Sequence, residues 1–322
     1  MGLKVLTEAG YNFGFGHYYR MLSICNRAVE QGVDLKMYLY SDEIARQSLD
    51  EPFITFFNWL ECDEWAGVLE KDDVVVIDSY HVDLDTLKEI KLNSGTMIVV
   101  DDNMRLPYED MCVLNPNYFA AYVDYYPDNA GNTYYLGKDY TLLRDAFIRP
   151  VDRTVKEAVT DVLITMGGTD LTGMTSKVIS FFNSLNRDGV SLHVVVTNAY
   201  KDIDTIRSML KPQDKCYVEI DAAQMSSLME KCDFAVASAG GTSNELIRMQ
   251  CPSILVTVAD NQANNVRLMS SRGFFDTFDA SDIDAVYTMF DYGKRKIMTD
   301  KLKTLYSEKT AADLVMNYVR NE

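Results

Sequence analysis

Short runs of apolar, often β-branched residues alternate along the chain with longer segments whose apolar positions recur at helical spacing. The first run covers residues 3–7 (LKVLT), and an amphipathic segment that stops at Gly32 follows it. Five apolar residues form the single stripe of that segment: Met21, Leu22, Cys25, Ala28 and Val29. A regular alternation of strand and helix patterns is typical of parallel α/β units.

The alternation occurs in two series, which predicts two domains. We expect the boundary near residue 150, after an irregular, tyrosine-rich stretch, with domains 1–149 and 150–322. The fold class predicted is α/β, with two Rossmann-like doubly wound domains facing a cleft. Ligands of such sheets bind beyond the carboxyl ends of the strands. The expected strands of the first half are residues 3–7, 35–40, 73–78, 96–102 and 111–116. In the second half, residues 161–170 are expected to form a strand and then a glycine turn, and further strands are expected at 191–197, 216–220, 232–238 and 252–258.

Composition narrows the classes of partner. The formal net charge of −17 over 322 residues disfavours approach to a nucleic-acid backbone, so we expect no nucleic-acid partner. No apolar run approaches the roughly 20 residues that span a bilayer, and the first ten residues do not resemble a signal peptide, which predicts a cytoplasmic protein. Six scattered cysteines without a CxxC pair indicate buried free thiols. The sequence carries no signal for an oligomeric state.

The turn after the first strand contains a glycine-rich motif, GFGHYYR, at residues 14–20. Gly14 and Gly16 allow the backbone to pass close to a ligand, and free N–H groups at a helix start attract anions. His17 at this position could act as a general base near neutral pH. Arg20 lies one turn later on the same face, where it could meet a phosphate. The alternative is a turn with a histidine that faces solvent.

Acidic residues end two strands that should be neighbours in the first domain. Asp78, Asp101 and Asp102 could orient sugar hydroxyls or a water, or raise the basicity of His17. Alternatively, they cap the following helices or accept hydrogen bonds from loop N–H groups. Other polar residues follow the same strand ends: Tyr80, His81 and Asn115. We expect His81 either to line this loop with them or to supply only surface polarity.

The second half carries two glycine turns at strand ends, MGGTD and SAGGTSNE. Paired glycines suit a diphosphate, and Glu245 in the first turns of a helix could bind both hydroxyls of a ribose. The alternative is a helix start with Thr242 or Ser243 as its cap and Glu245 as the capping-box partner. The candidate binding residues of this half are Gly167, Gly168, Thr169, Ser238, Gly240, Gly241, Thr242, Asn244, Glu245 and Gln262. His193 lies in the middle of a strand and is interpreted as structural.

These motifs together resemble the UDP-sugar hydrolases of the pseudaminic and legionaminic acid pathways, which group with the spore coat polysaccharide proteins of the GT-B glycosyltransferase superfamily. Eight segments carry the resemblance: residues 14–20, 75–83, 99–103, 113–117, 135–147, 166–170, 237–245 and 261–265. The resemblance implies hydrolysis of a UDP-linked 2,4-diacetamido-2,4,6-trideoxy sugar without a metal or other cofactor. It implies that His17 activates water, with Asp78 and Tyr80 at the sugar.

The same resemblance implies that the second domain binds UDP, with its glycine turns at the diphosphate and Glu245 at the ribose. A glycosyltransferase is the closest alternative, because His17 could deprotonate an acceptor hydroxyl in place of water. A third possibility is a protein that binds a nucleotide sugar without catalysis. The presence of both His17 and the ribose–phosphate motifs argues against the third possibility.

Overall fold

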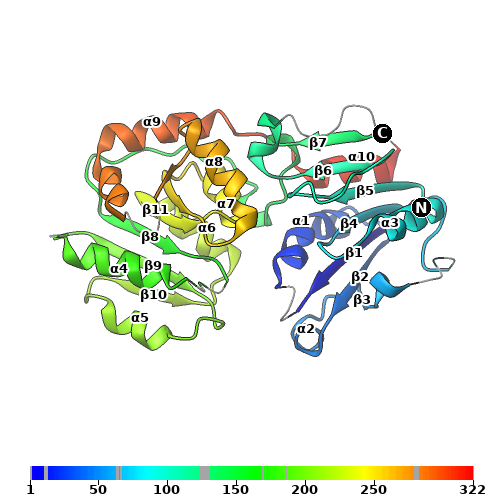
Figure 1. Cartoon of the computed structure of the whole chain (residues 1–322), viewed down its shortest axis with the longest axis horizontal. Coiled ribbons are helices and arrows are strands. Elements are labelled where there is room, and N and C mark those ends of the chain that lie inside the picture. Colours follow the sequence, from blue (N-terminus) through cyan, green and yellow to red (C-terminus); the bar gives the residue numbers. More distant parts are fainter. Residues whose placement is uncertain are drawn as a thin grey trace. The chain divides into compact units, whose positions relative to one another are not determined.

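The computed structural model describes residues 2–10, 14–62, 65, 67–123, 131–168, 170, 172–185, 187–278 and 283–321. The chain divides into two compact units (Figure 1). Unit 1 comprises Met1–Arg144 and Ser307–Glu322, and unit 2 comprises Asp145–Tyr306. Both units have parallel α/β architecture, as the alternating pattern predicts.

The sheet of unit 1 has seven strands in the order β3-β2-β1-β4-β5-β6-β7, and each neighbouring pair is parallel. Strand β7 lies within the stretch that the sequence pattern left irregular, and it forms an edge of the sheet, where it pairs with β6. A short strand at a sheet edge gives little periodicity to detect. The strands are β1 (Leu3–Ala9), β2 (Leu35–Ser41), β3 (Ile54–Phe56), β4 (Val74–Asp78), β5 (Thr96–Val100), β6 (Cys112–Asn115) and β7 (Thr133–Leu136).

Alternate side chains of the unit 1 strands enter two hydrophobic cores, one on each face of the sheet. In β1, Leu3 and Val5 contribute to one core and Leu6 to the other, because successive strand residues point to opposite faces. The helices are α1 (Gly16–Glu30), α2 (Glu43–Ser48), α3 (Leu84–Asn93) and α10 (Ala311–Arg320), with 3₁₀ turns η1 (Trp59–Glu61), η2 (Tyr118–Tyr122) and η3 (Lys138–Tyr140).

The C-terminal helix α10 belongs to unit 1, which differs from the expected division at residues 149 and 150. In Figure 1, α10 (red) lies with the blue and cyan elements of unit 1. Ala311 and Val315 of its apolar stripe are fully buried in the core that contains α1 and β1. Arg27 of α1 also donates to Asp313 Oδ1 at 2.9 Å. A strongly amphipathic last helix therefore completes the first core, and the sequence pattern could not show which core its stripe fills.

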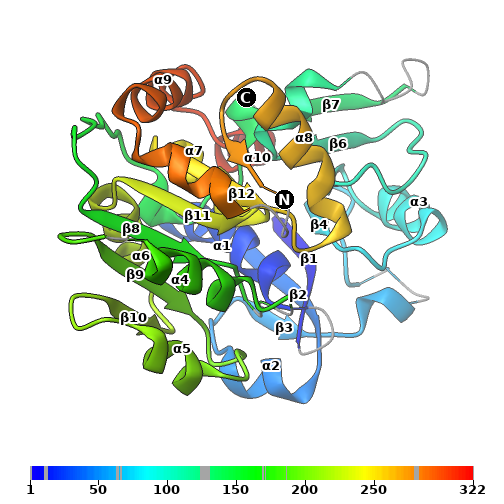
Figure 2. The same cartoon turned by 60° about the vertical axis from the view of Figure 1, so that its left-hand side comes forward.

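Unit 2 repeats the same topology with six strands, in the order β10-β9-β8-β11-β12-β13, all parallel. Figure 2 shows α4 beside α5, next to β9 and β10. The strands are β8 (Asp161–Thr165), β9 (Ser191–Val196), β10 (Lys215–Val218), β11 (Phe234–Ser238), β12 (Ser253–Val256) and β13 (Asp276–Thr277). The helices are α4 (Met174–Ser184), α5 (Ile203–Met209), α6 (Ala222–Lys231), α7 (Gly241–Arg248), α8 (Ala263–Ser271) and α9 (Tyr292–Lys303), with 3₁₀ segments η4 (Asp145–Phe147), η5 (Asp260–Gln262) and η6 (Ile283–Phe290).

Buried arginines bind the first segment of unit 2 to its body. Arg295 is fully buried and donates to the carbonyls of Lys156 and Glu157 at 3.0 and 2.8 Å. Arg248 donates from Nε to the carbonyl of Phe147 at 3.1 Å. These backbone carbonyls lie outside the strands, and guanidinium groups supply their hydrogen-bond donors.

Both sheets reverse their strand order at one point, between β1 and β4 in unit 1 and between β8 and β11 in unit 2. At such a switch point, the connections that follow the two neighbouring strands run in opposite directions and leave a crevice. Ligands of open α/β sheets bind there. Many of the predicted site residues lie at the ends of these four strands, and Asp101, Asp102, Asn115 and Gln262 lie at or after the ends of β5, β6 and β12. In the described part of the chain, no helix combines the length and apolarity needed to cross a membrane.

Candidate active site

His17 and Asp78 meet at the switch point of unit 1. The imidazole belongs to the first turn of α1, and the carboxylate ends β4. His17 Nδ1 lies 2.8 Å from Asp78 Oδ1, and both side chains are almost fully buried. Burial by itself would raise the pKa of Asp78, but Arg20 and His17 lower this pKa to about 2. Asp78 is therefore ionised and can only accept a hydrogen bond, so Nδ1 faces Asp78 as the donor and Nε2 is the ring nitrogen directed away from this carboxylate.

Arg20 pairs with carboxylates of its own unit. It donates from Nε and Nη2 to the two oxygens of Asp78, each at 2.5 Å, and from Nη1 to Asp102 Oδ2 at 2.6 Å. Burial alone would lower the pKa of Arg20, but the two carboxylates raise it well above its ordinary value. This geometry differs from the expectation that Arg20 meets a phosphate, because its donors are directed to Asp78 and Asp102. The (i, i+3) spacing from His17 predicted a shared face but not the acidic partners.

Tyr80 lies against His17 with the two rings perpendicular and their centroids 4.4 Å apart. Its hydroxyl donates to Asp102 Oδ1 at 2.7 Å, and burial together with Asp102 raises the pKa of the phenol. The hydroxyl is therefore held neutral over the physiological pH range. Arg20, Asp78, Asp102, Tyr80 and His17 thus form one continuous network, in which three sequence segments meet.

Glu8 is part of the same site and was not among the predicted residues. It lies in β1, its side chain is 1% exposed, and its Oε1 is 3.8 Å from His17 Nε2. The same oxygen accepts the backbone N–H of Tyr80 at 3.1 Å and lies 3.0 Å from His81 Nδ1, while Oε2 accepts from Ser79 Oγ at 2.7 Å. A carboxylate near the end of a buried strand was the available sequence signal, because carboxylates are rarely buried without partners.

Asp101 and Asn115 organise loops of unit 1. The two Asp101 oxygens accept the backbone N–H groups of Asn103 and Arg105 at 3.0 and 2.8 Å. Asn115 Oδ1 accepts the backbone N–H of Asn117 at 3.0 Å. The contacts of Asp101 correspond to the alternative role considered for strand-end acids, as acceptors for loop N–H groups. Substrate binding by Asp101 and Asn115 stays a prediction.

The two glycines of the first turn differ in whether the backbone conformation requires glycine. Gly14 adopts a φ of +71° and accepts the backbone N–H of Gly10 at 3.1 Å, so its conformation favours glycine. Gly16 begins α1 with an ordinary φ, and a Cβ built there meets no heavy atom of the described residues within 4 Å. Packing therefore does not require glycine at residue 16.

The glycine turns of unit 2 lie side by side, because β8 and β11 are neighbours. A Cβ added to Gly167, which has a φ of +80°, would lie 3.2 Å from Ser238 Oγ at the end of β11. Tyr200 donates from its hydroxyl to the carbonyl of Gly167 at 3.2 Å, and Thr197 donates to that of Gly168 at 2.5 Å. Thr169 lies outside the described residues. The structure thus brings Gly167, Gly168 and Ser238 together at the second switch point.

Helix α7 begins directly after the second glycine turn. Its N-cap is Gly240, with no hydrogen bond from a side-chain cap, so the alternative of a capping box with Thr242 or Ser243 and Glu245 does not apply. Ser243 instead donates from Oγ to the carbonyl of Gly240 at 2.7 Å. Among the described atoms, none lies within 4 Å of a Cβ built on Gly241 or Gly168. These turns therefore leave backbone accessible to a ligand, which is the property a phosphate site requires.

Gln262 and Asn265 support this turn from the segment after β12. Gln262 accepts the backbone N–H of Val258 at 3.0 Å, and its Nε2 would lie 3.4 Å from a Cβ at Gly240. Asn265, which was not predicted, donates from Nδ2 to the carbonyl of Ala239 and to Ser243 Oγ at 2.9 and 2.8 Å. The sequence feature that could have indicated Asn265 was the repeated asparagine in residues 261–265. The other candidates of α7 are Thr242, half-buried, and the buried pair Asn244 and Glu245.

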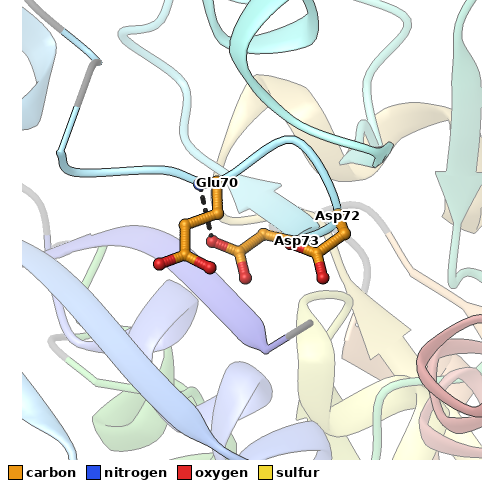
Figure 3. A group of neighbouring side chains, drawn as sticks. All are labelled: Glu70, Asp72 and Asp73. Carbon is orange, nitrogen blue, oxygen red and sulfur yellow. Dashed lines mark hydrogen bonds between the residues drawn. The ribbon is translucent and has the colours of Figure 1, made fainter.

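A separate group of three carboxylates lies at the opposite, amino-terminal end of β4 (Figure 3). The oxygens of Glu70, Asp72 and Asp73 lie within 4.8 Å of one another. Asp73 accepts the backbone N–H groups of Gly2 and Glu70, each at 2.9 Å, and lies 3.8 Å from Lys4 Nζ. These contacts assign Asp73 to fixing the start of the chain, and the cluster is remote from the switch point.

The fold places the chain in a class of proteins that is well represented among solved structures. MurG of Acinetobacter baumannii aligns over 100% of both chains with a TM-score of 0.66 and 11% identity. Spinosyn rhamnosyltransferase SpnG, solved with the spinosyn aglycone, aligns over 98% of this chain and 99% of its own, with a TM-score of 0.61 and 12% identity. The fold is the two-domain GT-B fold of these glycosyltransferases, as predicted.

The sequence relatives narrow that class, and they confirm the predicted resemblance to UDP-sugar hydrolases and spore coat polysaccharide proteins. The Campylobacter jejuni UDP-2,4-diacetamido-2,4,6-trideoxy-beta-L-altropyranose hydrolase is 23% identical, over 64% of this chain and 73% of its own. The Helicobacter pylori protein that combines this hydrolase with pseudaminic acid cytidylyltransferase is 24% identical, over 85% and 48%. The Bacillus subtilis spore coat polysaccharide biosynthesis protein SpsG is 23% identical, over 85% and 82%.

The extent of the match differs among relatives. The chain spans about half the length of some curated proteins that it matches, 48% of the Helicobacter pylori protein and 55% of an uncharacterised protein of Methanocaldococcus jannaschii. No protein-family model matches the chain.

Proposed function

We propose that this protein hydrolyses a UDP-linked 2,4-diacetamido-2,4,6-trideoxy sugar and releases UDP and the free sugar. The observation that carries the proposal is the placement of His17, whose Nδ1 is held 2.8 Å from the ionised Asp78 and whose Nε2 faces the switch point of unit 1. Relatives named as UDP-sugar hydrolases support this substrate class. Cytoplasmic location remains a prediction from the sequence.

In the proposed reaction, His17 Nε2 takes a proton from water as the water oxygen attacks the anomeric carbon of the sugar. The bond from that carbon to the phosphate oxygen breaks, and UDP leaves with this oxygen and its electron pair. The imidazolium that forms is stabilised by Asp78, in the way that a buried carboxylate supports a catalytic histidine. Arg20 holds Asp78 ionised, and Tyr80 restricts the imidazole ring from one side. Asp78 and Arg20 therefore act through His17 in this proposal, and Tyr80 is the neutral hydroxyl nearest to it.

UDP is assigned to unit 2. UDP is already a good leaving group, so the enzyme needs to bind its diphosphate and deliver one water. Gly168 and Gly241 offer accessible backbone at two adjacent strand ends for the diphosphate. Glu245, in the second turn of α7, is proposed to bind the ribose hydroxyls.

A glycosyltransferase with a UDP-sugar donor is the second candidate, because the neighbouring solved structures include glycosyltransferases. His17 would then deprotonate an acceptor hydroxyl. The two functions are separated by incubating the protein with a panel of UDP-sugars without acceptor and following UDP release. We expect release that is lost in His17→Gln while UDP still binds. Binding without release until an acceptor is added would instead identify the transferase.

The assignment of Glu245 has its own test. Glu245→Ala should raise KM for the UDP-sugar and weaken UDP binding by about tenfold, with kcat nearly unchanged, because ribose contacts are equal in ground and transition states. Glu245→Gln, which keeps the shape, checks folding, and Glu157→Ala provides an exposed glutamate of the same unit as control. A large loss of kcat with unchanged UDP affinity would overturn the assignment.

A further inference from the structure

Glu8 connects a buried histidine to an exposed one. Its Oε1 lies 3.8 Å from His17 Nε2 and 3.0 Å from His81 Nδ1. The side chain of His17 is 8% exposed, that of Glu8 is 1% exposed, and that of His81 is 52% exposed. The three groups therefore form a row from the interior of unit 1 to its surface.

The carboxylate of Glu8 is held in place independently of either histidine. Ser79 donates from Oγ to Oε2 at 2.7 Å, and the backbone N–H of Tyr80 donates to Oε1 at 3.1 Å. Ser79 Oγ in turn accepts the backbone N–H of His81 at 2.9 Å, which fixes the loop that carries the exposed ring. A carboxylate with only a structural role in a strand does not require two histidines beside one of its oxygens.

Resting on the proposed function, we propose that Glu8 and His81 carry the proton that His17 removes from the nucleophile to solvent. His17 Nε2 takes the proton and passes it to Glu8 Oε1, across a gap that one water or a shift of about 1 Å closes. Glu8 passes it to Nδ1 of His81 in the tautomer with hydrogen on Nε2. His81 then releases its Nε2 proton to solvent, and exchange with water restores the tautomer. No electron transfer or co-reactant is needed.

The charges around this row favour one direction of transfer. Asp78 contacts the other nitrogen of His17, and the guanidinium of Arg20 lies 3.1 Å from that nitrogen, so both groups act on Nδ1. Arg105 approaches the carbonyl of Ser79 at 3.4 Å from the loop after β5. Glu8 is the carboxylate facing Nε2 among the described residues, and it is the group placed to receive the proton.

The test uses His81→Gln in the full chain and measures UDP release at saturating UDP-sugar. In dilute buffer we expect kcat to fall by about tenfold, less than the roughly 10²–10⁴-fold that a group acting directly on the reacting atoms contributes, because His81 acts on the proton only after His17 has taken it. Added imidazole should restore the rate, because a small base replaces the exposed end of the row. Wild type and His193→Gln, the matched control in unit 2, should not respond to imidazole.

Glu8→Gln provides the second variant. It should lose activity to a similar extent without rescue, because imidazole does not replace a buried carboxylate, and Glu8→Gln/His81→Gln should be no slower than Glu8→Gln alone. Wild-type kcat in His81→Gln at low buffer, or a loss in the folded variant that imidazole does not restore, would overturn the relay. Absence of UDP release by the wild type would instead refute the proposed hydrolysis, and the relay with it.

Discussion

Among the residues that the structure describes, two histidine–aspartate pairs can be compared, and the pair in unit 1 is the one proposed to act in catalysis. His17 and Asp78 lie 2.8 Å apart in unit 1, and His193 and Asp161 lie 2.7 Å apart in unit 2. In both pairs the pKa of the carboxyl is about 2. Distance and charge state therefore do not distinguish them.

The second nitrogen of each ring makes the difference. His193 bonds Asp161 through Nε2 and the hydroxyl of Tyr217 through Nδ1, at the amino-terminal end of the sheet. His17 uses Nδ1 for Asp78, and its Nε2 lies at the carboxyl-terminal switch point, 3.8 Å from Glu8. A histidine acts as a base only where an acceptor nitrogen faces the place where ligands bind. The two pairs therefore differ in the end of the sheet at which they lie, and not in their distance. The carboxyl-terminal end, where ligands bind, distinguishes the pair proposed to be catalytic.

Replacing each histidine by glutamine gives the largest expected contrast. His17→Gln should lower kcat for UDP release by about a thousandfold, within the range for loss of a general base. His193→Gln should leave kcat within about twofold, because its ring nitrogens serve only unit 2 packing. Steady-state assays with a coupled UDP readout measure both. Equal losses in the two variants would refute the distinction between the pairs.

The cations beside the two pairs should differ in their effect on stability. Arg20→Gln removes the partner of two carboxylates, one of them fully buried, and should lower the unfolding free energy of unit 1 by about 3 kcal/mol. Lys231→Gln removes a half-exposed partner of Asp161 and should cost less than about 1 kcal/mol. Both tryptophans of the chain, Trp59 and Trp65, are buried in unit 1, so their fluorescence in urea reports that unit. A shift of this signal in Lys231→Gln matching that in Arg20→Gln would contradict the prediction.

The pH dependence of unfolding should also distinguish the two pairs, with a smaller effect on stability than the loss of Arg20. The pKa of Asp78 is about 2 against an ordinary 3.8, so its charge stabilises the fold fully above pH 3.8 and loses its effect as pH falls toward 2. The contribution is about 2 kcal/mol. Asp78→Asn should flatten the pH dependence of the tryptophan unfolding transition in this window, whereas Asp161→Asn should not change it. An unchanged slope in Asp78→Asn would show that the ion pair does not stabilise unit 1.

Periodicity and strand-end chemistry together predicted most of the fold and a substantial part of the site. Strands β1, β2, β4, β5 and β6 could be located because each contains buried apolar residues, whereas the half-buried strand β3 was not predicted. The short edge strand β7 likewise has no run of buried apolar residues. Glu8 was missed because its hydrogen-bond donors come from the loop after β4 and reach it only when β1 and β4 pair. Arg20 was assigned to a phosphate because its partners Asp78 and Asp102 are distant in sequence. Partnerships across a sheet depend on strand order, which local patterns do not encode.

The return of α10 to unit 1 has a consequence for the order of synthesis. Ala312 and Met316 enter the same core as Leu3 and Met21, so this core stays incomplete until residues 307–322 have been made. Unit 2 is one continuous segment and can fold as soon as residues 145–306 have left the ribosome. The nucleotide-binding part proposed here therefore matures first, and the unit with His17 closes around its last helix only after the whole of unit 2 exists.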